Sequence, residues 1–233
     1  IDKEAAQARR LEGLKQAEIA RKIAVKQAAE RLEKAIEKAV YYMSKSTTVN
    51  DHPYLKAKGL RASYNLRLSG TRLLMLTHTL AGDVTGAQLI FGEPEEWKDK
   101  KWNIGDKFFL AGTQKKGAVH WLDLPPDDQN PIAVCEGWAT CASLYEPEIN
   151  HQGAAVVAFD AGNIPVVVTE LLQRYPGNKI IVYADDDKAG RKAGKEAARL
   201  SERVSYKLPD WTATSEQGTD FNDWLVARRK GMK

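Results

Sequence analysis

The chain has 233 residues, of which 43% are hydrophobic, and this is enough to bury the core of one sizeable domain or two small ones. Its formal net charge of +4 permits contact with nucleic acid but does not demonstrate it. No stretch approaches the roughly 18 consecutive apolar residues that cross a bilayer, and the N-terminus has the composition of a charged helix rather than a signal peptide, so we expect a globular, cytoplasmic protein with no membrane partner.

The positive charge is concentrated at the N-terminal end of the chain. Residues 1–60 contain 13 Lys and Arg against 8 Asp and Glu, whereas the rest of the chain is nearly balanced. A solvated helix face gives the same count as a nucleic-acid contact, so both interpretations stay open on charge alone.

A helical segment is predicted for residues 1–50. From about Asp2 to Ser46 the chain has no proline and is rich in Ala, Glu, Lys, Arg and Gln, which indicates one long amphipathic helix or two. The apolar residues that recur at three- and four-residue steps are Val25, Ala29, Leu32, Ile36, Val40 and Met43. Because this stripe is thin before Val25, we expect the first part to project and the second half to contribute to stability.

A mostly-β subdomain is predicted for residues 51–130, after the turn-forming linker "TTVNDHP". Glycine-bearing turns separate short runs typical of strands, which are "RLLMLTH", "GAQLIF" and "KFFLAG". The proline-rich run "LPPDDQNP" then ends this pattern.

An α/β domain is predicted for residues 131–233, where strand-like and helix-like runs alternate. The predicted strands are "IAVCE", "AAVVAF", "KIIVYA" and "VSYKLP", and the helices are "WATCASLYE", "IPVVVTELLQRY", "AGRKAGKEAARLSER" and a last one from about Phe221 to Arg229. Alternating units of this kind predict a parallel sheet flanked by helices.

Acidic residues follow two of these strands. Glu136 comes after the first strand, and Asp185 and Asp187 come after the third. Ligands collect at the carboxyl ends of parallel strands, so we expect these acids to meet at one sheet edge. In extended backbone Asp185 and Asp187 point the same way while Asp186 points elsewhere. Carboxylates with phosphate oxygens and waters suit magnesium, and Gly190 lets the backbone turn closely into a helix whose N-terminal amides favour phosphate.

The motif "CEGWAT", followed one βα unit later by "ADDDKAG", resembles the Toprim domain shared by bacterial primases, topoisomerases and some nucleases. The signature of that family is Glu-Gly after one strand and Asp-x-Asp after a later strand, and the resemblance covers about Ile132 to Arg229. Further segments resemble the primases of plasmids and prophages, which are often fused to a helicase: "HPYLKAKG", "KFFLAGTQKKGAVHWL", "AFDAGNIP" and "GTDFNDWL". Residues 54–123 would then correspond to the basic subdomain that precedes Toprim in a primase catalytic core.

The resemblance implies a catalytic and metal-binding set. Glu136, Asp185 and Asp187 would be catalytic, and the same three with Asp220 and Asp223 would hold Mg²⁺, for which Mn²⁺ can substitute. Asp220 can equally be the N-cap of the last helix.

The resemblance also implies residues that bind nucleotide or DNA. They are Lys107, Lys115, Lys116, Asn163, Lys188, Arg191 and Lys192. For the basic side chains a solvated surface is the alternative, and Asn163 can instead cap the helix that begins at Ile164. Asp160, at a strand end, can join the acids.

The function implied is that of a DNA primase, which makes RNA primers on single-stranded DNA from ribonucleoside triphosphates by metal-dependent nucleotidyl transfer and works with a replicative helicase domain or subunit. Two alternatives stay open: a Toprim nuclease that uses the same acids with water as the attacker, and a non-catalytic nucleic-acid-binding or assembly module docked through the long helix. A topoisomerase is disfavoured because the chain has little room for a strand-cleaving tyrosine domain.

The number of cysteines and the first residues of the sequence differ from what a complete primase would show. Cys135 and Cys141 are the only cysteines, too few for the zinc module that many primases carry, and we expect buried thiols. The four histidines show no ligand spacing. Because the sequence opens at Ile1 in a helical run, we expect a fragment of a longer protein.

Overall fold

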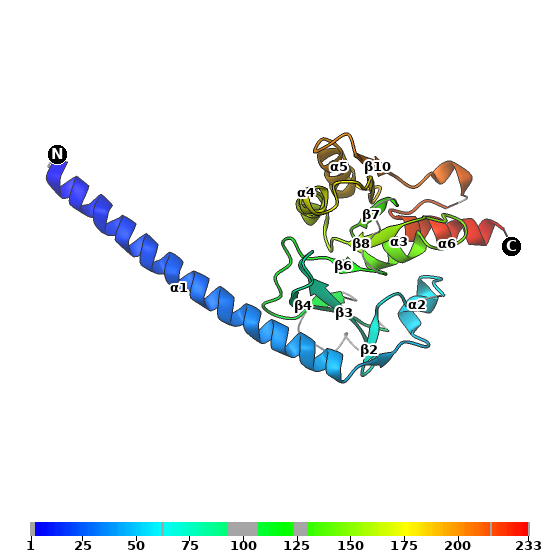
Figure 1. The fold of residues 1–233 in the computed structure, drawn as a ribbon, viewed down its shortest axis with the longest axis horizontal. Coiled ribbons are helices and arrows are strands. Elements are labelled where there is room, and N and C mark those ends of the chain that lie inside the picture. The colour runs from blue at the N-terminus through cyan, green and yellow to red at the C-terminus, as the bar shows by residue number, and fades with distance from the viewer. Residues whose placement is uncertain (1–2, 62, 93–106, 124–129, 215, 233) are drawn as a thin grey trace.

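The computed structural model describes residues 3–61, 63–92, 107–123, 130–214 and 216–232. One long helix leads into an antiparallel sheet and then into a second, mostly parallel sheet covered by helices (Figure 1). The predicted breaker "LPPDDQNP" lies mainly outside the described residues. Among those described, no helix combines the length and apolar composition that a membrane span requires.

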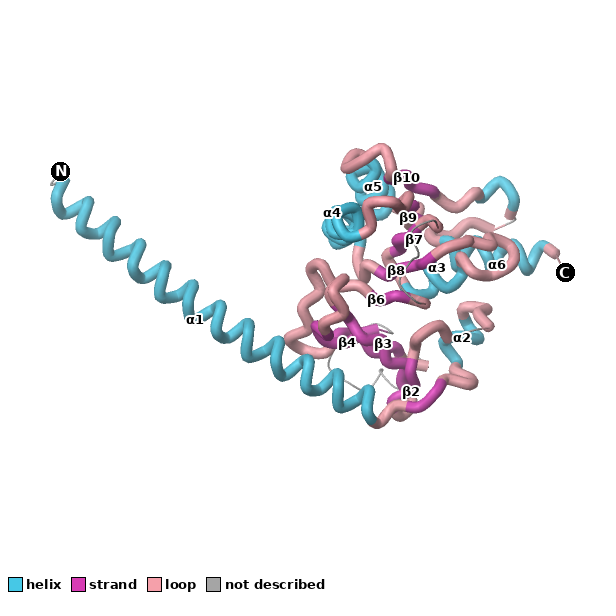
Figure 2. Tube along the Cα trace, viewed as in Figure 1, coloured by secondary structure: helices cyan, strands magenta, loops and turns pink. Residues whose placement is uncertain are grey.

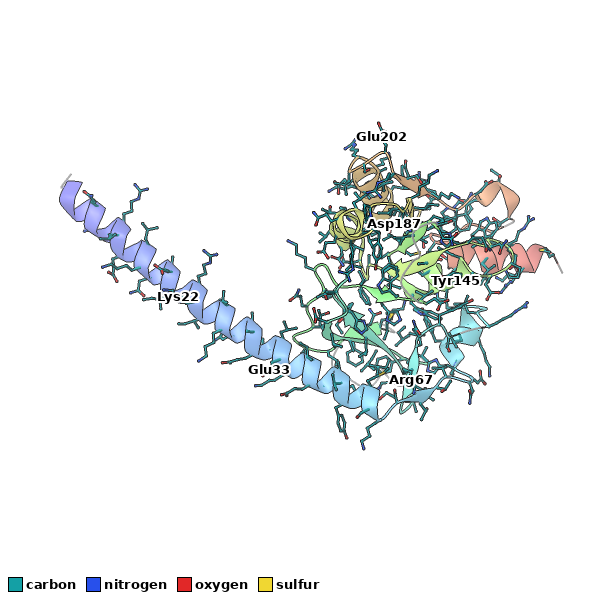
Figure 3. All side chains as sticks on the ribbon, viewed as in Figure 1. Lys22, Glu33, Arg67, Tyr145, Asp187 and Glu202 are labelled. Carbon is teal, nitrogen blue, oxygen red and sulfur yellow. The ribbon has the colours of Figure 1, made fainter. Side chains whose placement is uncertain are left out.

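The N-terminal helix α1 is a single element, Lys3–Ser44. Its N-terminal half extends away from the rest of the chain, as predicted, and Lys22 stands clear of the sheets (Figure 3). Among the described side chains of α1, those that are fully covered lie in its last turns, where Ala35 and Ala39 are 1% and 0% exposed.

The predicted apolar stripe of α1 is wrong in part. Val25, Val40 and Met43 are 62%, 50% and 38% exposed, and the covered face instead runs through Ala35 and Ala39. The physical reason is close approach, because small side chains let the helix backbone lie directly on the sheet. Gly112 also allows this close approach, because a Cβ at that position would collide with the backbone carbonyl of Arg31 in α1.

The first unit is an antiparallel sheet with strand order β1-β2-β3-β4-β5. Its strands are β1 (Thr47–Thr48), β2 (Arg67–Ser69), β3 (Arg72–His78), β4 (Val84–Ile90) and β5 (Lys107–Phe109), and the short helix α2 is Pro53–Ala57. Side chains alternate across β3. Leu74 packs with Ala39 of α1, whereas Leu73 and Met75 face the main core.

The second unit is a five-stranded sheet with strand order β10-β9-β7-β8-β6. Four strands run parallel: β7 (Ile132–Cys135), β8 (Ala154–Val157), β9 (Ile180–Tyr183) and β10 (Val204–Lys207). The edge strand β6 (His120–Trp121) is antiparallel to β8, so a strand from before residue 131 completes this sheet.

Helices cover both faces of the second sheet, which confirms the predicted α/β fold (Figure 2). They are α3 (Trp138–Ser143), α4 (Ile164–Arg174), α5 (Lys188–Ala198) and α6 (Phe221–Gly231), with 3-10 turns η2 (Ala161–Asn163) and η3 (Trp211–Ala213). Alternate residues of β7 face opposite ways. Cys135 joins the core with α3 and α6, and Val134 joins the core with α4 and α5.

Candidate active site

The acids that follow two strands meet at one sheet edge. Strands β7 and β9 are parallel neighbours, with Cys135 opposite Tyr183, so the residues that follow them leave the sheet at the same edge. Glu136 directly follows β7, and Asp185 lies in the turn after β9.

Both acids line a cleft of about 210 Å³ that lies between the two units. Its described lining is Lys58, Gln88, Lys107, Glu136, Gly137, Trp138, Ala139, Thr140, Val157, Phe159, Asp185 and Asp220. The second unit therefore supplies three carboxylates, and the first unit supplies two lysines and an amide.

Asp185 is the most strongly perturbed of these acids. Burial raises its pKa to about 7, and the negative charges of Glu136, Asp220, Asp187 and Asp223 add to the effect. Neighbouring carboxylates repel one another when all are ionised, which raises their pKa values. A bound cation offsets this repulsion and favours the ionised forms.

Glu136 is perturbed in the same direction and is also close to a cation. Burial is the main cause of its raised pKa, followed by the charges of Asp187 and Asp160, while Lys107 acts in the opposite direction and lowers it. Lys107 of the first unit and Glu136 of the second therefore interact electrostatically across the cleft.

The donor set suits a magnesium ion that is completed by substrate. The Oδ1 atom of Asp185 is buried and has no hydrogen-bond partner among the described residues. Within the same residues, no three carboxylate, imidazole or thiolate side chains converge on a single ion position. Magnesium binds through one or two carboxylates plus waters and substrate phosphates rather than through a closed set of protein ligands, so the two observations agree.

The acidic turn after β9 is shaped by the start of α5. Asp187 is the N-cap of this helix, and its Oδ1 accepts a hydrogen bond of 2.7 Å from the N–H of Gly190. A Cβ on Gly190 would collide with the backbone of Asp185, which confirms the predicted close turn. However, β9 ends at Tyr183, so strand alternation is not what directs these side chains.

Asp186 points away from the cleft, as predicted. Its Oδ2 accepts a 3.0 Å hydrogen bond from Nε1 of Trp211, and its carboxylate pairs with Arg191. Its backbone N–H donates to the oxygen of Thr219. Asp186 thus ties the acidic turn to the loop that carries Asp220.

Asp220 is the N-cap of the last helix, and its place in the cleft lining leaves the predicted metal role open. Its Oδ1 accepts a 2.8 Å hydrogen bond from the N–H of Asp223 and caps α6, while the residue also lines the cleft. Asp223 lies one turn further, and its Oδ2 accepts from the N–H of Thr219 at 3.0 Å. Its carboxylate therefore braces the turn before the helix.

Of the three predicted basic residues in the first unit, Lys107 lines the cleft, and Lys115 and Lys116 are not part of its described lining. The Nζ atom of Lys115 lies 4.7 Å from the ring centre of Phe109, which meets cleft-lining Phe159 edge to face at 5.5 Å. Lys116 is exposed beside Lys115.

The predicted basic residues of α5, which are Lys188, Arg191 and Lys192, lie toward the start of the helix and are exposed. Arg191 is engaged by Asp186, and Lys192 lies 3.7 Å from the carboxylate of Glu196 on the same helix. Lys188 begins the helix directly after the capping Asp187.

Asn163 is a scaffold residue, so its predicted binding role is wrong. It is buried, its Nδ2 donates to the carbonyls of Ala118 and Ala158, and its Oδ1 accepts from the N–H of Gly117. Because these bonds occupy the amide, it is not available to a ligand. Its side chain does not cap α4 either; instead Asp160 accepts from its N–H.

Several lining residues were not predicted, among them Lys58, Gln88, Thr140 and Phe159. Lys58 belongs to the quoted run "HPYLKAKG", and Gln88 is a polar residue inside an apolar strand, so the sequence around each of them could have pointed to a site residue. No sequence feature pointed to Thr140. Phe159 has φ of +71°, a rare conformation for a side chain of its size, and no sequence pattern predicts it.

The last helix holds Lys58 in place through its backbone. The Nδ2 atom of buried Asn222 donates a 2.8 Å hydrogen bond to the oxygen of Lys58. Arg229 donates from Nη1 to the oxygen of Gly59 at 2.6 Å and pairs with Glu146. Two units far apart in sequence are thereby joined beside the cleft.

Comparison with known proteins gives a family match for the second unit. Residues 131–231 match the Toprim domain family. The chain is 29% identical over 160 residues, 64% of its length, to DNA primase TraC of Escherichia coli, and 28% identical over 158 residues to a second DNA primase TraC of that organism. These matches cover 10% and 14% of the two relatives, so the chain spans only about a tenth of their length.

Two solved structures are similar to part of this chain. The primase fragment of the bacteriophage T7 primase-helicase protein has a TM-score of 0.45 and 15% identity, with 76% of this chain and 67% of that chain covered. The DnaG primase catalytic domain bound to single-stranded DNA has a TM-score of 0.45 and 16% identity, with 76% and 55% covered.

Proposed function

We propose, from the premise that residues 131–231 form a Toprim domain of the plasmid-primase type, that this chain carries the catalytic site of a DNA primase. The reaction is synthesis of RNA primers on single-stranded DNA from ribonucleoside triphosphates. The observation that supports it best is the cleft in which Glu136, Asp185 and Asp220 face Lys58 and Lys107.

The acids have two tasks in this proposal. Asp185, Glu136 and Asp220, with Asp187 and Asp223 beside them, would hold Mg²⁺ or Mn²⁺, which would stabilise the negative charge on the α-phosphate during nucleotidyl transfer. Glu136, whose raised pKa favours proton uptake, accepts the proton of the 3′-hydroxyl as that oxygen attacks the α-phosphorus of the incoming triphosphate and pyrophosphate leaves.

The basic residues have the complementary task. Lys58 and Lys107 offset the charge of the triphosphate as it enters the acidic cleft. Lys115 and Lys116 continue this basic surface along the first unit, where single-stranded DNA contacts phosphate-binding lysines and the ring of Phe109. Lys188 and Lys192 remain accessible to phosphate on the first turn of α5, and Arg191 contributes only if it leaves Asp186.

A primer-synthesis assay on single-stranded DNA of mixed sequence, with labelled ribonucleotides and Mg²⁺ or Mn²⁺, tests the proposal. We expect labelled products longer than a dinucleotide, which Asp185→Asn abolishes. Glu202→Gln, an exposed acid beyond α5, is the matched control and should keep full activity. Shortening of the DNA without primer formation would instead identify a nuclease. If the chain catalyses neither reaction, it is a non-catalytic module.

A replicative helicase, as a further domain of a longer protein or as a separate subunit, completes this proposal. The exposed half of α1 is its candidate contact, because Leu11, Leu14 and Ile23 are each more than half exposed there. Loss of helicase binding on removal of residues 1–20, with primer synthesis unchanged, would support this contact.

A further inference from the structure

We propose that a second cavity, separate from the acidic cleft, binds a free nucleotide, a small molecule in which a sugar joins a flat nitrogen heterocycle to a phosphate group. This junction pocket has a volume of about 820 Å³, within the usual range of about 300 to 1,000 Å³ for ligand sites. Its walls come from both units, with Arg67 and Leu76 on one side and Trp121, Arg174 and Tyr175 on the other.

The junction pocket lies on the opposite face of the first sheet from the acidic cleft. Leu74 and Leu76 of β3 line the junction pocket, whereas Gln88 lines the cleft. Gln88 is paired with Met75, which lies between the two leucines. Because side chains alternate along a strand and paired residues share a face, the two sites are on opposite faces.

Aromatic and aliphatic side chains form the wall for a flat ring. The rings of Trp121 and Tyr175 meet edge to face with centroids 6.0 Å apart. Leu66, Leu74 and Leu80, all mostly buried, add an apolar surface beside them. A heterocycle that stacks or slides between such groups buries both of its faces.

A buried histidine is one of the residues that line this wall. His120 is 4% exposed, and its Nδ1 donates a 3.0 Å hydrogen bond to the oxygen of Leu76. Burial lowers its pKa to about 4, so the ring is neutral and Nε2 is an acceptor. Among the described residues Nε2 has no hydrogen-bond partner. The Nε2 atom is itself covered by its neighbours, so it is an unpaired acceptor behind the wall rather than on its surface.

Two arginines give the pocket its preference for an anion. Arg67 uses Nε and Nη2 on Ser46, at 3.2 and 3.3 Å, and these two bonds leave Nη1 for a ligand. Arg174 lies in the last turn of α4 and is exposed. Guanidinium groups bind phosphate through paired hydrogen bonds. Asp123, the one carboxylate in the described lining, opposes an anion on its own side and so directs the phosphate toward the arginines.

The test is calorimetric titration of the full chain with AMP and GMP in EDTA, which prevents metal-dependent binding at the acidic cleft. We expect saturable binding of at least one of them, and weaker binding of adenosine, of inorganic phosphate and of a short single-stranded oligonucleotide. Tighter binding of the oligonucleotide would overturn the assignment of a free nucleotide.

Variants then locate the site. Arg174→Gln, an exposed change that leaves the core intact, should weaken AMP or GMP binding about tenfold or more, the size of a lost charge-assisted hydrogen bond. Arg199→Gln, another exposed helix-end arginine, is the matched control, and Asp185→Asn should leave binding unchanged. Absence of binding by both nucleotides, or binding that Asp185→Asn alters and Arg174→Gln does not, would overturn the proposal.

Discussion

Asn222 of α6 donates a hydrogen bond from Nδ2 to the backbone oxygen of Lys58, at 2.8 Å, and thereby ties the end of the chain to the first unit. The same amide donates to Oγ of Ser143 at 3.0 Å. A buried side chain thus links three elements beside the acidic cleft without lining it.

Replacing this amide is expected to change both stability and substrate binding. Asn222→Ala leaves buried partners without a donor, which costs about 1 to 3 kcal/mol of unfolding free energy. Because Lys58 then loses its anchor, KM for the nucleotide should rise several-fold with little change in kcat. Denaturant titration and steady-state kinetics measure the two effects. Gln173→Ala, on the exposed face of α4, is the control, and equal KM values in both variants would contradict the positioning role.

The raised pKa of Asp185 predicts a pH-dependent stability in the metal-free protein. Since the folded pKa of about 7 lies above the unfolded value of about 3.9, the protonated acid favours folding, and this stabilisation is lost as pH rises from about 4 to above 7. The Asp185→Asn variant should therefore have a higher melting temperature than wild type at pH 8 in EDTA. The expected rise is about 2 to 4 °C for each kcal/mol by which the substitution increases the unfolding free energy.

Thermal denaturation at pH 5 and pH 8, with and without Mg²⁺, checks this. Mg²⁺ at pH 8 should stabilise wild type and not Asp185→Asn. If both proteins show the same pH dependence, Asp185 is not the group that titrates.

The three consecutive aspartates are expected to differ in function. Asp185→Asn and Asp187→Asn should each abolish nucleotidyl transfer and weaken Mn²⁺ binding, and asparagine at 187 can still cap α5, so the fold is kept. Asp186→Asn should retain most activity, since its carboxylate contacts Trp211 and Arg191 rather than the cleft, and should cost at most about 1 kcal/mol.

Primer synthesis together with electron paramagnetic resonance of free Mn²⁺ distinguishes the three variants. Comparable damage from all three substitutions, or unchanged Mn²⁺ binding in all of them, would show that the site is arranged differently.

Removal of residues 1–20 should leave the melting temperature and metal binding nearly unchanged. The described side chains of this segment are exposed, so its removal takes almost no buried surface from the folded state. Differential scanning calorimetry on the shortened chain measures this, and a large drop would show that the first half of α1 is packed in solution.

The covered face of α1 makes a prediction that the original apolar stripe does not. Ala39→Leu should destabilise the protein by about 1 to 3 kcal/mol, because the added side chain has no room against the first sheet. The neighbouring change Val40→Ala should cost less than about 0.5 kcal/mol, since Val40 is half exposed. Chemical denaturation of the two variants compares their unfolding free energies directly. A larger loss of stability in Val40→Ala than in Ala39→Leu would show that the predicted apolar stripe is the buried face of α1.

Sequence alone determined the order of strands and helices in residues 131–233 and the meeting of Glu136 with Asp185. Both are local properties: apolar runs of strand and helix period alternate, and parallel strands place whatever follows them at one edge. The close turn at Gly190 and the outward direction of Asp186 were predicted as well, although the cause is the cap of α5 rather than strand alternation.

Only the tertiary structure decided which residues meet across the two units. Lys58 and Gln88 reach the cleft because the first sheet packs on the second, and Asn163 is removed from binding because its amide holds the loop at residues 117 and 118. The covered face of α1 likewise depends on how closely a helix can approach a particular sheet. Such contacts join residues far apart in the chain, and no pattern of spacing within one segment carries them.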